Sequence, residues 1–191
     1  MNALQPRTLT PTAAEWPPYL ATRLTPQSPA SLQLLGPEGL LSSLRIALFC
    51  SARTPGEAIL PTYDTARTFR DEGVTVISGF HSQIEKECLR ILLRGSQPII
   101  ISPARSMDRM RIPLECKAAF DAGRLLYLSP FIDAPRRMTR KSAMRRNEIV
   151  AAIADEVVFM HIDPNGELAR IQALVARWEI PYRVIGGHSD F

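Results

Sequence analysis

The chain has 191 residues, of which 46% are hydrophobic and 22% charged, so its composition is that of one globular domain and excludes a disordered chain. No apolar run reaches the ~18 residues that cross a bilayer, and the first residues lack the apolar core of a secretory signal, so we expect a cytoplasmic protein. The three cysteines form no CxxC pair and the three histidines have no metal-ligand spacing. We therefore expect no metal centre, and we expect Cys50, Cys88 and Cys116 to be small core residues in a reducing compartment.

The net charge of +4 is unevenly distributed along the chain. Residues 136–146 contain six basic side chains and no acid, so this segment carries +6 and the rest of the chain carries −2. The positive charge is local, which indicates a site for anions rather than a generally basic protein.

The first 43 residues are rich in proline, with seven of the sixteen prolines in the first 40 positions. Pro17-Pro18 and Pro37 exclude a long helix there. We predict a flexible lead over 1–14 and a strap with short helical turns over 15–43, followed by the main domain over 44–191. Six apolar residues are expected to dock the strap onto the domain: Trp16, Tyr19, Leu20, Leu32, Leu34 and Leu35.

From Arg45 onward, short apolar runs alternate with longer helical stretches. The predicted strands are 45–50, 74–78, 98–102, 124–129, 156–162 and 182–186. The predicted helices are 61–73, 82–95, 113–123, 142–156 and 166–179, with Pro61 and Pro113 at first helical positions and Gly73, Gly95 and Gly123 just after helix ends. Strands separated by such helices require parallel crossovers. The sequence predicts a doubly wound, Rossmann-like, mainly parallel α/β sheet of about six strands with helices on both faces.

In such a sheet, ligands bind beyond the carboxyl ends of the strands. Hydroxyls, a glycine and arginines follow these ends, and together with free N–H groups at helix N-termini they predict a phosphate or nucleic-acid site. Phe80 and Phe131 are the candidates for base stacking. The candidate binding residues are Ser51, Arg53, Ser78, Gly79, Phe80, Arg105, Arg136, Arg137, Arg140, Lys141, Arg145, Arg146 and Asn147.

Plainer interpretations remain open for these residues. Ser78-Gly79 is compatible with an ordinary strand-to-helix turn capped by Ser82, and Arg53 and Arg105 with ordinary surface positions. The basic run is compatible with a solvated loop. Two observations favour a bound anion. Arg145 and Arg146 fall in the first turn of the predicted helix 142–156, where each cation is destabilised by the helix dipole by ~0.3–1 kcal/mol. The four preceding basic residues have no acidic residue nearby in the sequence.

The motifs of several enzyme classes are missing. The segment after the first strand reads FCSARTPG, without GxGxxG, and the chain contains no GxxxxGK[ST] or GxSxG. Asp155 and Glu156 are expected to face water, and Glu167 is explained by its position at a helix N-terminus. We predict no catalytic residue and no cofactor, so the sequence favours binding over catalysis.

Several of these positions match one known family. The segment EWPPYLATRLTPQSPASLQLLGPEGLL resembles its lead-in, and Arg53 stands where its GSR motif has arginine. Ser78-Gly79 matches the start of SGxARGID, Asp108 and Pro113 match an LD…YP pattern, and Arg146-Asn147 matches its RN element. From about Glu15 to Gly187 the chain resembles the DprA/Smf DNA-processing family, here a short form that ends at Phe191 without the winged-helix tail common in the family.

The resemblance implies single-stranded DNA as the partner, bound by a basic pocket at the carboxyl end of the sheet. It also implies homodimerisation through the Rossmann-like domain, RecA recombinase as a partner, and a role in recombination or natural transformation. The alternative is a protein that binds or hydrolyses nucleotides. Phosphoribohydrolase relatives in the same superfamily carry a PGGxGTxxE loop, of which residues 161–167 keep fragments.

Overall fold

The computed structural model describes residues 5–133 and 135–186; the first four residues of the predicted lead and the last five of the predicted domain lie outside it. Six strands of one sheet are parallel to one another: β3 (Arg45–Cys50), β4 (Thr75–Ser78), β5 (Ile99–Ile101), β6 (Leu125–Ser129), β7 (Glu156–His161) and β8 (Tyr182–Val184). All six lie within the predicted strand ranges, because near-continuous apolar runs indicate strands buried on both faces.

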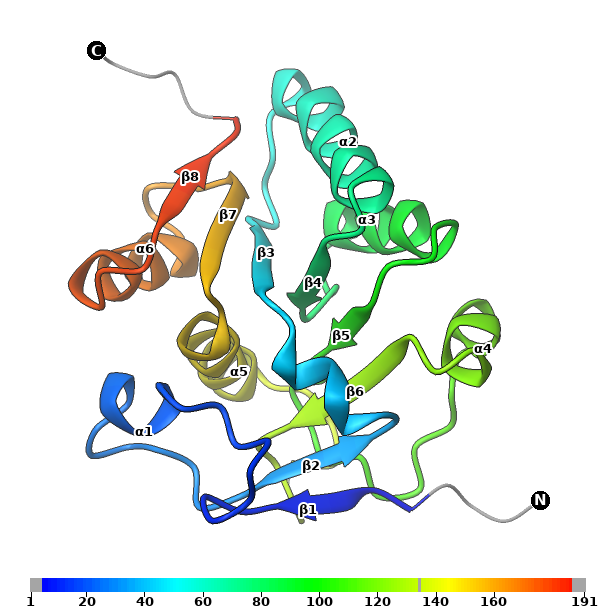
Figure 1. The fold of residues 1–191 in the computed structure, drawn as a ribbon. Helices are drawn as coiled ribbons and strands as arrows, with labels where there is room; N and C mark the ends of the chain where they lie inside the picture. Colours follow the sequence, from blue (N-terminus) through cyan, green and yellow to red (C-terminus); the bar gives the residue numbers. More distant parts are fainter. Residues whose placement is uncertain (1–4, 134, 187–191) are drawn as a thin grey trace.

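Two further strands extend the sheet at one edge. They are β1 (Arg7–Leu9) and β2 (Leu32–Leu35), which pair antiparallel with each other and, through β2, with β6. The full order is β1-β2-β6-β5-β4-β3-β7-β8, so the sheet has eight strands rather than about six (Figure 1). The predicted flexible lead was wrong for Arg7–Leu9, because the Leu9 side chain is buried and the backbone pairs with β2.

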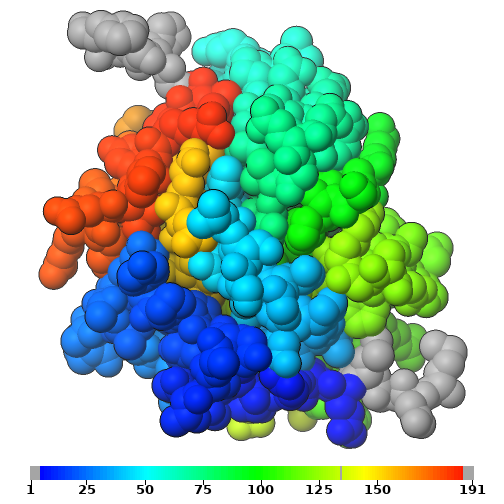
Figure 2. All heavy atoms as spheres, viewed as in Figure 1, coloured from blue at the N-terminus to red at the C-terminus, as the bar shows by residue number. Residues whose placement is uncertain are grey.

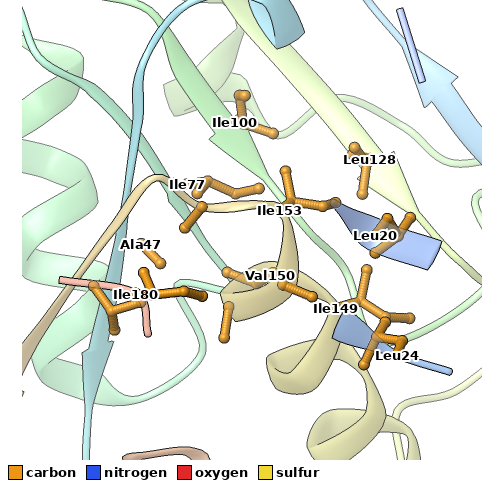
Figure 3. Packing of buried hydrophobic residues seen from close by; sticks show 14 of the residues in the cluster. Leu20, Leu24, Ala47, Ile77, Ile100, Leu128, Ile149, Val150, Ile153 and Ile180 are labelled. Atoms are coloured by element: carbon orange, nitrogen blue, oxygen red, sulfur yellow. The ribbon is translucent and has the colours of Figure 1, made fainter. Parts of the chain in front are cut away.

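Helices cover both faces of the sheet, as predicted. One face carries α2 (Gly56–Asp71), α3 (Gln83–Leu93) and α4 (Leu114–Asp121), and the other carries α5 (Arg140–Ile153) and α6 (Glu167–Arg177) (Figure 1). Alternate strand residues point to opposite faces and form two separate apolar cores. Ile149, Val150 and Ile153 of α5 share one core with Ile77 and Ile100 of the sheet, and Figure 3 shows Ile153 directed toward these two residues. The Rossmann-like α/β class is confirmed.

The strap packs on the same face as α5. It contains α1 (Leu20–Arg23) and a 3₁₀ helix over Glu38–Ser42, with β2 between them. Trp16, Leu20 and Leu24 are buried in the core beneath α5, whereas Tyr19 is exposed, contrary to its predicted docking role. Leu20 and Leu24 lie beside Ile149 in Figure 3. The other predicted docking residues, Leu32, Leu34 and Leu35, are buried as part of β2.

Two helix starts differ from their predicted positions. Helix α2 begins at Gly56, so Pro61 lies inside it rather than at its first position. Helix α5 begins at Arg140 after Thr139, whose hydroxyl caps the Ser142 N–H at 3.1 Å, so Arg145 and Arg146 lie in the second turn. Gly73 and Gly123 do follow helix ends with positive φ values of 75° and 70°, as predicted.

Asp155 does not face water as expected; it anchors the start of β3. Its carboxylate accepts hydrogen bonds from Arg45 N at 2.8 Å, Nε at 3.0 Å and Nη2 at 3.2 Å. Arg45 is buried, so this pair fixes the amino ends of β3 and β7 together. Glu156 pairs with Arg183 of β8 at 3.2 Å.

The remaining expectations concern membranes and cysteines. No helix in the described part of the chain is long and apolar enough to cross a membrane. All three cysteines are free and buried, as expected for core residues.

Candidate functional site

Four buried serines mark the carboxyl ends of adjacent strands. Ser78 and Ser129 end β4 and β6, and Ser51 and Ser102 directly follow β3 and β5. Their hydroxyls tie down the loops: Ser78 Oγ accepts from Phe80 N at 3.3 Å, Ser129 Oγ from Phe131 N at 3.1 Å, and Ser51 Oγ from Asp163 N at 2.9 Å. Ser102 Oγ is buried without a partner in the described part of the chain. This edge of the sheet is called the rim below.

At the centre of the rim, the side chain of Arg146 lies over Gly79. A Cβ on Gly79 would overlap Nη1 and Cζ of Arg146, so only glycine leaves room for the guanidinium. Nη1 donates to the Ser102 carbonyl at 2.8 Å, and Nε to Asn147 Oδ1 at 2.7 Å. The structure thus brings together Gly79, Arg146 and Asn147, three of the predicted site residues.

Arg146 is only 4% exposed, and it forms no ion pair with a carboxylate among the described residues. Burial lowers its pKa, and the negative charge of Glu85 opposes this effect. A buried cation without an ion-pair partner is electrostatically unfavourable, because few protein contacts compensate for the hydration free energy that the charge loses on burial. A bound anion would remove this penalty.

Glu85 organises the start of α3 beside Arg146. Its buried carboxylate accepts three backbone N–H groups, from Cys50 at 3.0 Å, His81 at 2.8 Å and Ser82 at 3.0 Å. Ser82 caps the helix in return, so Ser82 and Glu85 form a capping box. The interpretation of Ser82 as a cap is confirmed. The box also joins the ends of β3 and β4 at the rim.

The basic segment is less free of acids than the sequence indicated. Arg140 pairs with Glu167 at 2.6 Å, because the N-termini of α5 and α6 meet. Arg145 pairs with Glu148 at 3.1 Å and donates to the Gln27 carbonyl of the strap. Its side chain therefore contacts Glu148 and the strap, whereas that of Arg146 lies over Gly79.

The basic residues in the first turn of α5 are not the predicted ones. Since α5 begins at Arg140, its first turn contains Arg140 and Lys141 and no acid, and Arg145 and Arg146 lie beyond the turn where the dipole acts. Arg136, Arg137 and Lys141 are exposed and belong to no ion pair within the described residues. These three side chains are available to a ligand on the surface, in addition to the buried Arg146.

Arg105 and Arg136 line a small polar pocket next to the rim. Its volume is about 290 Å³, and Ser106, Asp108, Arg109, Ile132 and Asp133 complete the lining. Arg53 is exposed on the loop after β3. Phe80 is 5% exposed and packs in the core, so it offers no face for base stacking; Phe131 is half-buried and keeps that option.

Sequence reasoning missed Glu85 as a member of this edge. Glu85 had a readable signal, because Ser82-x-x-Glu85 at the start of an apolar helix is the pattern of a capping box. The contact of the Ser102 carbonyl with Arg146 joins residues 44 positions apart, so no local pattern indicated it.

Within the described residues, no three His, Cys, Asp or Glu side chains come together to hold a metal. Burial raises the pKa of the Cys50 thiol at the end of β3 to about 11, so this sulfur stays protonated at neutral pH.

The fold and the rim define a Rossmann-like α/β protein with a buried arginine at the carboxyl edge of its sheet. The sequence matches the family of DNA recombination-mediator protein A over residues 7–172, so the chain belongs to this family. The resemblance to DprA/Smf proteins is confirmed. No curated protein matches the sequence.

Solved structures agree with this fold. DNA processing protein A from Streptococcus pneumoniae superposes with a TM-score of 0.79 at 15% identity, covering 98% of this chain, which spans 66% of that protein. The Helicobacter pylori protein gives 0.76 at 20% identity, covering 98% of this chain and 83% of that one. The molybdenum cofactor carrier protein from Chlamydomonas gives 0.51 at 15% identity, covering 75% and 76%.

Proposed function

We propose that this protein binds single-stranded DNA at the rim, with Arg146 as the central phosphate ligand. The observation that carries the proposal is a buried guanidinium, placed over a glycine and without an acidic partner in the described structure. Its Nη2 group has no acceptor among the described residues and is available to a phosphate oxygen. Family membership supports this ligand, as does the single-stranded DNA binding of the Helicobacter pylori protein.

The exposed basic side chains extend the proposed site along a DNA strand. Arg136, Arg137 and Lys141 precede or open α5, and Arg53 lies on the loop after β3, so they can follow a phosphate backbone that passes Arg146. Ser51 and Ser78 belong to the site as supports of its loops, and the Gly79 backbone lies beside the guanidinium. Arg140 and Arg145, which have carboxylate partners, contribute less.

The recessed position of Arg146 favours single strands. A flexible backbone can bend one phosphate into the rim, whereas the stiff backbone of a duplex cannot do so without deformation. Phe131 remains the candidate for stacking on a splayed base.

The test is a fluorescence-anisotropy titration of a 20-nucleotide oligo(dT) and of a matched duplex over a salt series. Five basic residues (Arg53, Arg136, Arg137, Lys141 and Arg146) predict a log–log salt slope of about −3.5 for the single strand, from about −0.7 per phosphate. The triple variant Arg136→Ala/Arg137→Ala/Lys141→Ala should reduce this slope by about 2. The control triple Arg90→Ala/Arg94→Ala/Lys117→Ala, on α3 and α4, should leave it unchanged. Salt-independent affinity, or equal slopes in both triples, would refute the proposal.

The family also supports finer proposals. We infer a cytoplasmic homodimer that acts in recombination or DNA uptake and that has RecA recombinase as a partner. Light scattering tests the dimer, and the loading of purified RecA onto strands coated with this protein tests the partner. A monomer at micromolar concentration, or RecA loading that ignores the protein, would contradict these two points.

A second candidate ligand is a free nucleotide. The pocket of about 290 Å³ beside Arg105, Arg109 and Arg136 has arginines suited to a phosphate group. A thermal-shift screen with mononucleotides and cyclic nucleotides separates the two ligands, since binding at a hundredfold excess over Kd stabilises by ~2.7 kcal/mol. Stabilisation by a nucleotide without retention on single-stranded DNA would favour this second candidate.

A further inference from the structure

A groove lies between the strap and α6, and none of its lining residues belongs to the rim. Its volume is about 560 Å³, with strap residues 22–27 on one side, α6 on the other and Glu148 of α5 between them. In Figure 2 the strap (blue) adjoins α6 (orange) at one side of the molecule. Because α6 begins at the rim with Glu167 and runs away from it, residues 174–178 lie at the opposite end of this helix from the proposed DNA site.

The groove combines an apolar wall with a basic edge. Leu24, Leu174 and Trp178 supply apolar surface; Leu24 is buried, and the other two are half-buried against the core. Three arginines and one glutamate line it, a net charge of +2: Arg23, Arg170, Arg177 and Glu148. A ligand for this surface needs both an apolar group and negative charge.

Much of the positive charge is already engaged, which argues against a phosphate chain as the occupant. Arg23 Nη1 donates to the carbonyls of Ala152 and Ala154 at 2.9 Å each and so caps the C-terminus of α5. Arg170 pairs with Glu148 at 2.7 Å. Arg177 remains as an exposed cation without an ion pair among the described residues.

One exposed cation beside an indole and two leucines suits a ligand with few charges. A nucleic-acid strand carries one negative charge per nucleotide and is bound by several cationic side chains at once. This groove does not offer several free cations. A peptide with one large apolar side chain and one or two neighbouring carboxylates matches both features, with the apolar group against Trp178 and Leu174 and a carboxylate on Arg177.

We propose that the groove between the strap and α6 is a docking site for an acidic peptide segment of a partner protein, anchored by a large apolar side chain. The site is independent of the rim, so it does not depend on the proposed DNA binding. Arg23 and Glu148 fix the walls of the groove, since each joins two elements: Arg23 ties the strap to α5, and Glu148 ties α5 to α6.

The experiment is a selection from a random twelve-residue peptide display library on the full chain, followed by Kd measurements on the selected peptides. We expect sequences in which an aromatic or leucine side chain is flanked by Asp or Glu. Arg177→Glu should weaken their binding at least tenfold. The matched control is Arg94→Glu, since Arg94 is also an exposed arginine at the end of a helix but lies on α3, away from the groove, and it should bind as the wild type does.

Three outcomes would overturn the proposal. They are a selection with no acidic consensus, selected peptides that bind Arg177→Glu and wild type equally, and an oligo(dT) affinity that Arg177→Glu lowers while no peptide is selected. The last outcome would make the groove part of a DNA path. The variant Arg136→Ala/Arg137→Ala/Lys141→Ala provides a further check. If it loses oligo(dT) binding and keeps peptide binding, the groove and the rim are two independent binding sites.

Discussion

The guanidinium of Arg146 occupies the space that a side chain at position 79 would need. Gly79 is required for space rather than for backbone conformation, because its φ is not among the positive values of the described chain. The glycine admits a cation to the end of β4, and the Ser102 carbonyl at 2.8 Å holds it there. The proposed DNA site therefore depends on a contact between residues 67 positions apart.

Replacing this glycine tests the relationship directly. Gly79→Ala should displace the guanidinium, destabilise the fold by about 1–3 kcal/mol through overpacking, and lower oligo(dT) affinity at least tenfold. Urea denaturation and anisotropy measure the two effects. Gly39→Ala is the control, because a Cβ on Gly39 meets nothing within 4 Å and its φ is not positive.

The double variant Gly79→Ala/Arg146→Ala separates the clash from other effects. Without the guanidinium the new methyl group has room, so the double variant should be more stable than the sum of the two single losses predicts. Oligo(dT) binding should stay weak in all three variants. Additive stability losses would show that Gly79 acts through something other than Arg146.

Glu85 is expected to contribute more to the free energy of unfolding than Glu87, the other glutamate of α3. Glu85→Gln replaces one acceptor oxygen with an NH₂ group that faces the backbone N–H groups of Cys50, His81 or Ser82, which should cost about 2–3 kcal/mol. Glu87→Gln, which removes only partly exposed contacts with Arg90 and Gln83, should cost less than about 1 kcal/mol. Similar urea midpoints for the two variants would contradict the role given to Glu85.

The anchor of β3 gives a second stability prediction. Asp155→Ala leaves the buried Arg45 guanidinium without its carboxylate and should cost about 3–5 kcal/mol. Glu156→Ala, the adjacent acid with a solvent-exposed partner, should cost less than about 1 kcal/mol. Thermal and urea unfolding of the two variants side by side provide the measurement, and equal losses would mean that the Arg45 pair is not the anchor.

The central sheet could be predicted from sequence, whereas its edge could not. Runs such as residues 74–78 and 98–102 are apolar throughout, and that pattern is typical of parallel strands covered on both faces. The Leu32–Leu35 strand is equally apolar, but it stands among prolines and pairs with β6, about 95 residues later. Its pairing with β6 and with β1 makes it a strand, whereas the local pattern indicated a docking strap.

That the candidate residues gather at one edge of the sheet was also predictable, because the carboxyl ends of parallel strands meet there. The contacts of the individual basic residues were not predictable, since they depend on where α5 begins and on which elements pack against its first turns. A start two residues earlier than predicted moved Arg145 and Arg146 out of the first turn. Glu167 partners Arg140 because two helix N-termini meet, which no local pattern shows.

The last prediction concerns pH and His81, which follows Gly79 and Phe80 at the rim. Partial burial lowers its pKa below the ordinary value of 6.5, and the positive charges of Arg146 and Lys86 lower it further, while Glu85 opposes them. The free protein therefore holds His81 neutral at pH 7. For stability, a depressed histidine pKa means that the contribution is present above pH 6.5 and is lost as pH falls.

DNA binding should show the opposite trend. A phosphate near His81 favours the imidazolium, so the pKa in the complex should be higher than in the free protein, and affinity should rise as pH falls below about 6.5. A pKa difference of one unit gives a rise of about tenfold at the acidic limit. Oligo(dT) titrations from pH 5.5 to 8, with NMR titration of the His81 imidazole in the free and bound states, measure both quantities. His81→Gln should flatten the profile; an unchanged profile in that variant, or the same His81 pKa with and without DNA, would place the bound strand away from the start of α3.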